Sequence, residues 1–343
     1  MGSAHTVAVY GAYGHTGRFV VAHLLERGFR PVISGRDAGK LAGLAASRPG
    51  LEARPAPVGD PDALDRALAG TAAVINCAGP FATTADPVIE AALRAGIPYV
   101  DVAAEIEAVL DTFAHHADRA RAAGSVIVPA MAFYGGLGDL LVTAAMGDWT
   151  AADEAHIAYG LNSWHPTAGT RAAGQVSRER RNGRRVRYTG GRLEYRDDTP
   201  PTLKWPFPEP MGTRAVIGEF TMADAVTVPS HLRVPEVCTY MTVEAAGDVS
   251  TPDTPAPTPA DDRGRSAQTF LVDAVVRADG TERRAVASGR DIYAVTAPLA
   301  VEAVARILTG RTRTTGVASA GEMFDAADFL RALSPHVSLD LRQ

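Results

Sequence analysis

Three glycines near the start of the chain are spaced to bind a phosphate group. Gly11, Gly14 and Gly17 follow the apolar run 7–10 and lead into an amphipathic stretch, residues 15–27. Glycine lets a tight turn adopt left-handed backbone angles and keeps side chains away from a bound pyrophosphate. A helix that begins there adds unpaired N–H groups and the positive end of its dipole. The further residues of this turn that we expect to contact a cofactor are Tyr13, His15 and Thr16.

The next apolar stretch, residues 31–34, ends in Gly35-Arg36-Asp37. At this strand end a carboxylate holds the ribose hydroxyls of NAD, whereas an arginine holds the 2′-phosphate of NADP. Arg36 fits the second case, with Ser34 as an additional donor. Asp37 is the competing candidate for a ribose contact, but its position favours capping of the following helix. We therefore expect NADP(H) as the cofactor.

Other candidate cofactor contacts lie at the ends of later strands. The loop after the strand expected at residues 72–76 passes near the nicotinamide ribose in a doubly wound sheet. The alternative is a simple turn with a buried phenylalanine. Asp60 ends the third expected strand and either reaches adenine or caps a helix, since proline follows it. The contacts expected from the loop are Cys77, Ala78, Gly79, Pro80 and Phe81.

Three residues are candidates for proton transfer. Tyr134 follows the sixth expected strand in a glycine-rich segment, where its hydroxyl can donate to a developing oxyanion or enolate. His165 lies in a loop, where an imidazole near the crevice would suit proton delivery. Asp101, with Glu105 nearby, ends the fifth expected strand. The structural alternatives are a packed hinge aromatic, a surface histidine and helix-capping carboxylates.

Composition excludes several classes of function. The 343 residues include 34 basic and 39 acidic side chains, so the net charge of −5 gives no reason to expect a nucleic-acid partner. Cys77 and Cys238 form neither a disulfide framework nor a metal-binding spacing, and we expect no metal site. The only lysines are Lys40 and Lys204, which rules out a Tyr-x-x-x-Lys pair. No apolar run is long enough to span a membrane and no signal-peptide pattern is present, so we expect a cytoplasmic protein.

The arrangement of strand and helix patterns predicts an α/β fold with two parts. Residues 1–147 alternate between the two patterns, which indicates a doubly wound parallel Rossmann sheet, joined by returning helices in 294–343. Residues 148–293 predict an inserted mixed or antiparallel α+β domain for substrate binding and dimerisation. The strands expected in the first part are 7–10, 31–34, 52–58, 72–76, 99–102 and 126–129, and the helices 15–27, 38–47, 61–69, 84–95 and 106–122. In the second part, strands are expected at 154–161, 185–196, 214–228, 237–245, 269–277 and 283–293.

An arginine-rich segment, residues 178–192, stands out in the second part. Asn182-Gly183 in its middle predicts a β-hairpin turn. Such a cluster is either a solvated face or a binding site for an anionic handle, such as an acyl carrier.

The chain resembles the saccharopine dehydrogenase-like reductases, in particular the short bacterial members that include trans-acting enoyl reductases. The resemblance implies a Rossmann domain, an inserted mixed sheet for substrate and subunit contacts, and NAD(P)-linked reduction. Ala104 departs from the family pattern, in which glycine precedes the glutamate. The matching segments are 11–18, 34–37, 76–81, 99–105, 168–170, 289–293 and 308–310.

These observations predict an NADPH-dependent reductase that transfers hydride to the C=C bond of an enoyl substrate, either small or bound to an acyl carrier. The choice of an enoyl bond rests on the resemblance alone. Imine or amino-acid reduction of the saccharopine type and carbonyl reduction are the alternatives. A protein of another class, a sensor or scaffold that binds NADP without turnover, also fits the sequence. We expect a homodimer.

Overall fold

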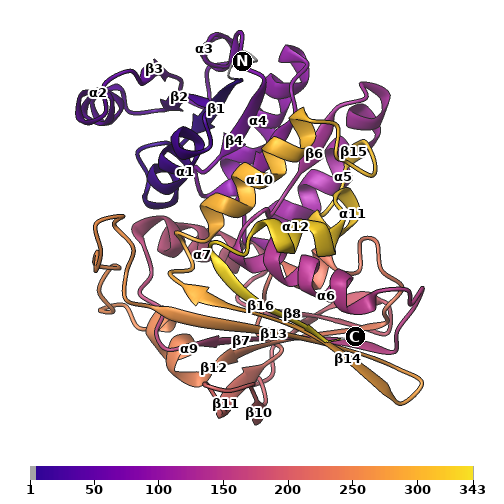
Figure 1. Ribbon diagram of the computed structural model, residues 1–343. Coiled ribbons are helices and arrows are strands. Elements are labelled where there is room, and N and C mark those ends of the chain that lie inside the picture. Colours follow the sequence, from indigo (N-terminus) through magenta and orange to yellow (C-terminus); the bar gives the residue numbers. More distant parts are fainter. Residues whose placement is uncertain (1–4, 343) are drawn as a thin grey trace.

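Two β-sheets organise the computed structural model, which describes residues 5–342 (Figure 1). The upper layer in Figure 1 carries most of the helices, and the lower layer is an extended sheet. The two layers share one continuous apolar core, which runs from Val9 and Ile75 in the first sheet to Tyr159 and Phe270 in the second. The sheets are therefore held together by packing and not only by connecting loops.

The first sheet is parallel throughout. Its order, β15-β6-β5-β4-β1-β2-β3, reverses direction between β1 and β4, which is the point where doubly wound folds bind nucleotides. Val7, Val9 and Ile75 are fully buried, as expected for interior strands covered by helices on both faces. The predicted α/β Rossmann fold is confirmed. The strands are β1 (Thr6–Tyr10), β2 (Arg30–Gly35), β3 (Glu52–Pro55), β4 (Ala73–Asn76), β5 (Tyr99–Asp101), β6 (Val126–Val128) and β15 (Gly316–Val317).

Local sequence signals explain where the helices of this layer begin. The Asp37 carboxylate accepts a hydrogen bond from the Lys40 N–H (3.0 Å) and caps α2, and Asp60 caps α3 in the same way. The helix expected from residue 84 begins earlier, at Phe81, and continues through Pro87. The helices are α1 (His15–Glu26), α2 (Ala38–Ser47), α3 (Pro61–Leu68), α4 (Phe81–Ala95), α5 (Ile106–Ala122), η1 (Phe133–Leu137), α6 (Gly138–Met146), α10 (Thr296–Leu308), α11 (Ala320–Met323) and α12 (Ala326–Ala332).

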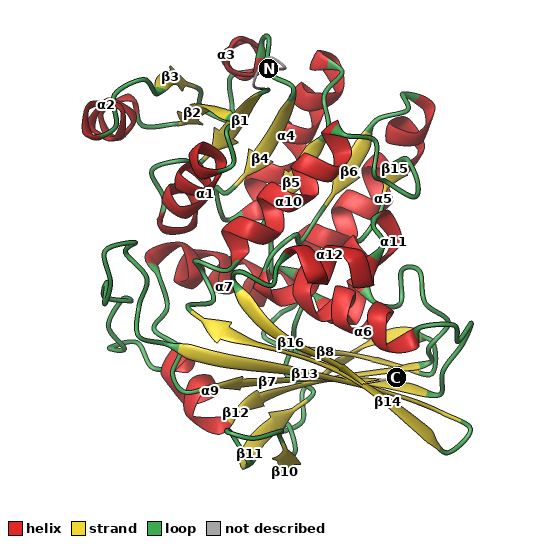
Figure 2. Ribbon diagram, viewed as in Figure 1, coloured by secondary structure: helices red, strands yellow, loops and turns green. Residues whose placement is uncertain are grey.

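The second sheet is mixed. Its main path is β10-β11-β12-β7-β13-β14-β16; β8 pairs with β12 and β9, and only the β12–β7 pair is parallel. Helices α6 and α12 lie between this sheet and the first layer (Figure 2). The strands are β7 (Glu154–Leu161), β8 (Arg185–Thr189), β9 (Arg192–Arg196), β10 (Thr202–Pro206), β11 (Thr213–Gly218), β12 (Glu236–Thr242), β13 (Thr269–Ala278), β14 (Thr281–Arg290) and β16 (Val337–Arg342). The helices of this part are α7 (Ala168–Arg180), α8 (Asp224–Thr227) and α9 (Val243–Ser250).

Three expectations for the second part were wrong in detail. Asn182-Gly183 does not form the hairpin turn; it links α7 to β8, and Gly190-Gly191 connects β8 to β9. Both Asn182 and Gly183 have positive φ (54° and 76°), so the pair has the backbone of a hairpin turn but serves to end a helix. The strand expected over 214–228 ends at Gly218 and is followed by α8. Strand β16, which the sequence groups with the first domain, pairs with β14 in the second sheet.

Candidate cofactor and substrate cleft

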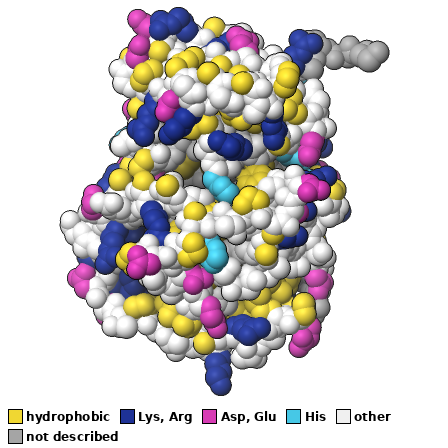
Figure 3. Space-filling view, turned by 90° about the vertical axis from the view of Figure 1, so that its left-hand side faces the viewer, with side chains coloured by type: hydrophobic (Ala, Val, Ile, Leu, Met, Phe, Trp, Pro, Cys, Tyr) yellow, Lys and Arg dark blue, Asp and Glu magenta, His cyan; other side chains and the backbone are white. Residues whose placement is uncertain are grey.

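A cleft of about 1550 Å³ lies between the two layers and is lined by residues from both. Its upper rim is formed by the loops that follow β1, β2, β4 and β5, at the carboxyl ends of these strands. Its lower rim is formed by α7, α9 and the segment after β11. Basic side chains gather across the middle of the face shown in Figure 3, between the two layers. The cleft therefore occupies the position at which this sheet order places a dinucleotide.

The glycine turn lines the cleft with Gly11 and Gly14, and its close-packed backbone admits no side chain at Gly11. Gly11 has a φ of +82°, and a Cβ on it would lie 2.8 Å from the backbone nitrogen of Ala78. A Cβ on Gly17 would clash with the Gly11 carbonyl, so this glycine permits close packing of α1 on the turn and does not itself line the cleft. Gly14 precedes α1 without any side-chain cap, which leaves the first N–H groups of the helix available for an anion.

Tyr13, His15 and Thr16, the further cofactor contacts expected from this turn, line the cleft. The His15 ring packs edge-on against Phe19 and Tyr293, and burial lowers its pKa, so the imidazole is neutral at pH 7. His15 Nε2 is buried and has no hydrogen-bond partner within residues 5–342. A buried polar atom without a partner, beside the glycine turn, is consistent with a site where a polar ligand supplies the missing hydrogen bond.

The end of β2 presents two cationic side chains to the cleft. Arg36 is exposed, lines the cleft and makes no hydrogen bond or ion pair with any residue that the structure describes. Lys40, one helical turn further on, also lines the cleft, and its Nζ lies 5.6 Å from the centre of the Tyr13 ring. Lys40 forms a long contact, 3.7 Å, with the Asp37 carboxylate. Lys40 was not among the cofactor contacts that the sequence predicted.

Two predicted cofactor contacts do not line the cleft. Ser34 is fully buried, and its hydroxyl donates to the Arg54 carbonyl (2.7 Å), which ties β2 to β3. Asp60 accepts a hydrogen bond from the Ala63 N–H (2.9 Å) and caps α3. Both side chains make hydrogen bonds within the fold, and neither lines the cleft in which the cofactor is expected.

The loop after β4 lines the cleft from Cys77 to Phe81, which includes Ala78, Gly79 and Pro80, as predicted. Burial raises the pKa of the Cys77 thiol, so this cysteine is an inert wall residue and not a nucleophile. The Phe81 N–H, at the start of α4, donates to Glu105 Oε2 (2.7 Å).

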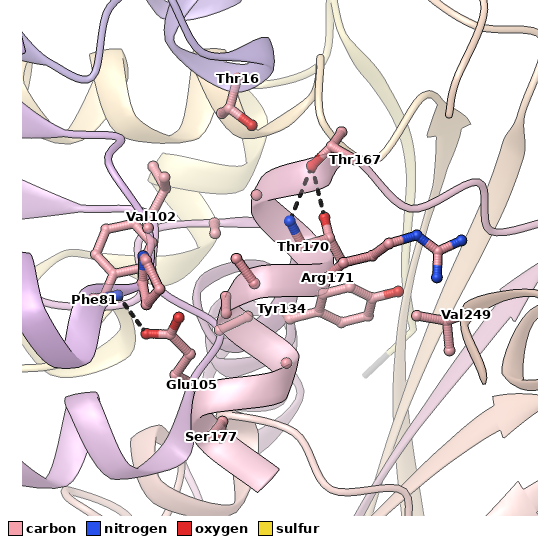
Figure 4. A pocket seen from close by; sticks show the side chains of 18 of the residues that line it. Thr16, Phe81, Val102, Glu105, Tyr134, Thr167, Thr170, Arg171, Ser177 and Val249 are labelled. Atoms are coloured by element: carbon pink, nitrogen blue, oxygen red, sulfur yellow. Dashed lines mark hydrogen bonds between the residues drawn. The ribbon is translucent and has the colours of Figure 1, made fainter. Parts of the chain in front are cut away.

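Glu105 is an acidic side chain in the wall of the cleft (Figure 4). It is 5% exposed, and burial raises its pKa to about 8, although the hydrogen bond from Phe81 acts in the opposite direction. Its second carboxyl oxygen, Oε1, has no partner among the described residues. The carboxyl group is thus mainly protonated at pH 7, with one oxygen free to act on a ligand.

Asp101 was expected at the site, but it does not line the cleft. Its carboxylate is buried and accepts hydrogen bonds from the Tyr99 hydroxyl (2.9 Å) and from the N–H groups of Ala103 (3.0 Å) and Ala130 (2.8 Å). Burial raises its pKa to about 6. With its acceptors occupied by the fold, Asp101 holds the chain ends of β5 and β6 together.

Tyr134 lines the cleft within the irregular helical turn η1. Its ring packs against Phe133, Tyr159 and Trp164 at centroid distances of 4.8, 4.9 and 5.0 Å. Its hydroxyl is buried without a hydrogen-bond partner in the described part of the chain. Burial raises its pKa well above 10, so the hydroxyl keeps its proton and serves as a donor only. Figure 4 shows the ring beside α7, on the side of the cleft away from Glu105.

His165 does not line the cleft, although its neighbours Trp164 and Thr167 do. Its backbone carbonyl accepts a hydrogen bond from the Tyr293 hydroxyl (3.3 Å). The same hydroxyl contacts Thr170 Oγ1 (2.9 Å) and Trp164 Nε1 (3.2 Å), which fixes the start of α7. The structure therefore uses the backbone of His165 and gives its imidazole no place at the site.

The arginine-rich segment is mostly paired with carboxylates. Arg180 contacts Asp111, and Arg185 and Arg187 both contact Glu219. Arg178 lines the cleft and has no such partner within the described chain. The segment is thus largely a network of ion pairs. Within the described chain, Arg178 and Arg184 have no carboxylate partner, and Arg184 donates to the Arg181 carbonyl (3.3 Å).

Comparison with known proteins bears on the cofactor domain and on the fold. Residues 7–128 match the family model described as the saccharopine dehydrogenase NADP binding domain. A probable mitochondrial saccharopine dehydrogenase-like oxidoreductase from Arabidopsis thaliana is 35% identical over 144 residues, which are 38% of this chain and 32% of that protein.

Among solved structures, saccharopine dehydrogenase (L-Glu forming) from Saccharomyces cerevisiae covers 99% of this chain and 100% of its own, with a TM-score of 0.67 and 13% identity. At that identity the likeness shows the fold. Triphenylmethane reductase from Citrobacter sp. is 28% identical over 30% of this chain and 38% of its own, with a TM-score of 0.27.

None of the helices within residues 5–342 is long and apolar enough to cross a membrane.

Proposed function

We propose that the chain is an NADPH-dependent reductase of a carbon–carbon double bond in an enoyl substrate. The match of residues 7–128 to the saccharopine dehydrogenase NADP binding domain supports the cofactor and does not favour an enoyl bond over others. One observation carries the proposal. A single cleft joins a cationic pair suited to a 2′-phosphate, Arg36 and Lys40, to two proton donors. These are the Tyr134 hydroxyl and the Glu105 carboxyl group, of which the hydroxyl and Oε1 have no partner in the described chain. The glycine turn lies between the two ends, where the diphosphate of a dinucleotide belongs.

The residues present fit NADP(H). Gly11 and Gly14, which line the cleft without side chains, and the uncapped start of α1 suit the diphosphate. Arg36 and Lys40 carry the positive charge that distinguishes NADP from NAD, and no acidic side chain at the end of β2 competes for a ribose, since Asp37 is used as a helix cap. The loop from Cys77 to Phe81 would face the nicotinamide side. When bound, NADPH supplies a hydride.

Tyr134 and Glu105 are suited to complete such a reduction. Saturation of a C=C bond requires a hydride on one carbon and a proton on the other, or on a conjugated carbonyl oxygen. Tyr134 keeps its proton because burial raises its pKa, and its hydroxyl has no other partner, so it can donate to the developing enolate. Glu105 is protonated at neutral pH and supplies a second donor on the opposite side of the cleft. The packed rings of Phe133 and Trp164 keep water from this region.

Beyond Tyr134 the cleft has an apolar wall, which favours an acyl chain over a purely polar amino acid. The wall is built from Trp164, Phe220, Met222, Val243 and Val249. A protein that only senses NADP has no need of a cleft that continues past the cofactor position, so this extension supports an enzyme.

Reduction of an imine, as in saccharopine formation, is the second candidate. The matching family model is that of saccharopine dehydrogenase, which favours this candidate. The arginine side chains in the cleft favour it as well, because they could bind the carboxylates of an amino-acid substrate. The same two donors would then protonate the nitrogen.

The test is the consumption of NADPH by the purified chain with crotonyl-N-acetylcysteamine as an enoyl thioester, and with a 2-oxo acid plus an amino acid as an imine source. Turnover of the thioester supports the first proposal. Turnover of the imine source alone replaces it with the second, and binding of NADPH without turnover of either points to a sensor.

A further inference from the structure

The part of the cleft beyond Tyr134 is lined by two unlike sets of side chains. One set comes from α7, which contributes Arg171, Gln175 and Arg178 to the lining. Helix α9 and the segment after β11 also line this part of the cleft, with the apolar side chains Phe220, Val243 and Val249. A ligand that fills this space meets both cations and hydrocarbon.

The two arginines lie on the same face of α7. Arg171 and Arg178 are seven residues apart, close to two helical turns, so their Cα positions are separated by about 10 Å along the helix axis. Gln175 lies between them on the same face. The start of α7 is fixed by its Thr167 cap, whose hydroxyl accepts from the Thr170 N–H (3.0 Å). The helix therefore holds these three side chains along the cleft from a fixed start. Figure 4 shows the Thr167 cap and Arg171 at this start.

The charges of these two arginines are not neutralised within the described chain. Arg178 is exposed and has neither an ion pair nor a hydrogen bond from its side chain. Arg171 bonds only to backbone carbonyls, those of Thr251 (3.2 Å) and Thr254 (2.8 Å), and so keeps its full charge.

The other charged groups in this region are paired. Glu219 lines the cleft but is held by Arg185 (2.6 Å) and Arg187 (3.1 Å). Arg181 contacts Glu107 (3.5 Å), and its Nε is buried with no partner among residues 5–342. The substrate end of the cleft thus carries positive charge, from Arg171 and Arg178, that no carboxylate in the described chain neutralises.

We propose that this end of the cleft binds an anionic group, a carboxylate or a phosphate, carried by a substrate whose body is apolar, with Arg178 as its principal anchor. This inference rests on the proposed function, because it names the class of substrate that the reductase takes. A guanidinium group binds either anion through two parallel N–H donors and is favoured where such recognition is needed. The apolar side chains of the lining bind the body by burial of hydrocarbon surface.

The experiment uses the full chain saturated with NADP⁺ and three probes of equal chain length, octanoate, octyl phosphate and octanol, titrated by calorimetry. We expect at least one of the anions to bind about tenfold more tightly than octanol, as one charge-assisted hydrogen-bonded contact provides. Arg178→Gln removes that advantage and leaves the octanol affinity unchanged. Arg180→Gln is the matched control, since Arg180 lies on the same helix, outside the cleft lining, in contact with Asp111.

The outcomes separate the possibilities. Preference for octyl phosphate assigns the anion to a phosphate, and preference for octanoate assigns it to a carboxylate. Equal affinity for all three probes, or an anion preference that survives Arg178→Gln, overturns the inference. If NADP⁺ itself does not bind, the proposed function fails, and the same titrations on the cofactor-free chain still decide the question of the anion.

Discussion

The Phe81 N–H donates a 2.7 Å hydrogen bond to Glu105 Oε2 and leaves Oε1 of the same buried carboxyl group without a partner. This contact joins the first residue of α4 to the loop after β5. It places a group with a pKa of about 8 in the wall of the cleft.

If protonated Glu105 takes part in the reaction, kcat/KM falls as the pH rises through about 8. Glu105→Gln keeps an oxygen for the Phe81 N–H and cannot ionise, so the fall disappears and the maximal rate is lower. The measurement is kcat/KM against pH for both proteins. The same alkaline fall in the variant would assign it to another group.

The raised pKa of Glu105 also predicts how stability depends on pH. The folded chain binds this proton more tightly than the unfolded chain does, since the pKa rises from 4.5 to about 8. The stabilisation is complete below about pH 4.5 and is lost as the pH rises through 8. Urea titration measures the free energy of unfolding of the wild type and of Glu105→Gln. Between pH 5 and pH 9, we expect the wild type to lose stability relative to the variant. A constant difference over that range would contradict the pKa.

Tyr134→Phe separates the role of the hydroxyl from that of the ring. The ring contacts with Phe133, Tyr159 and Trp164 remain, and the hydroxyl that is lost has no partner in the described chain. We expect kcat to fall by about 10²-fold or more, as for loss of a general acid. The NADPH dissociation constant and the free energy of unfolding stay within experimental error or improve slightly, because a buried unpaired group is removed. Unchanged turnover would exclude Tyr134 as the proton donor.

Asp101→Ala tests the structural role of that carboxylate. The change leaves three buried donors unpaired, and each such donor costs about 1–3 kcal/mol when it stays unpaired. We expect a clear loss in the free energy of unfolding, while the folded variant keeps the alkaline fall in kcat/KM. Asp60→Ala is the control: it removes a helix cap, costs about 1 kcal/mol and leaves NADPH affinity unchanged. A folded Asp101→Ala variant of normal stability and no turnover would restore Asp101 as a catalytic residue.

Strand ends and helix caps were the features that the sequence predicted well. Alternating apolar runs located β1, β2, β4, β5 and β6 within a residue or two, and Asp37 and Asp60 cap helices as their positions suggest. These signals are local, since a cap or a buried strand depends on neighbouring residues. The glycine turn belongs to the same group, because backbone angles at Gly11 decide its shape.

The site residues that the sequence missed depend on contacts between distant segments. Asp101 and Glu105 lie at the two ends of the same loop. Only the fold shows that the Asp101 carboxylate accepts hydrogen bonds from Tyr99, Ala103 and Ala130. Glu105, in contrast, lines the cleft. Ser34 points to β3 instead of the cofactor for the same reason. Helix α7 was missed because it buries little beyond Ser177, so its sequence lacks the apolar stripe that marks a helix.

The cationic pair at the end of β2 offers a graded test of cofactor choice. Lys40→Gln removes one of two charges, and we expect NADPH affinity to fall by about tenfold with little change for NADH. Its effect is smaller than that of a change at Arg36, because Lys40 is partly neutralised by Asp37. Equal losses of affinity for NADPH and NADH would mean that Lys40 contacts a part of the molecule that the two coenzymes share.

The most direct test of the account is calorimetric titration of NADPH and NADH into the wild type, Arg36→Glu and the control Arg48→Glu, an exposed arginine at the end of α2 that does not line the cleft. The account predicts that the wild type prefers NADPH, that Arg36→Glu weakens NADPH binding by about a hundredfold while NADH binding changes little, and that the control behaves as the wild type. Binding of neither coenzyme by the wild type, or an equal loss of both in Arg36→Glu, would contradict it.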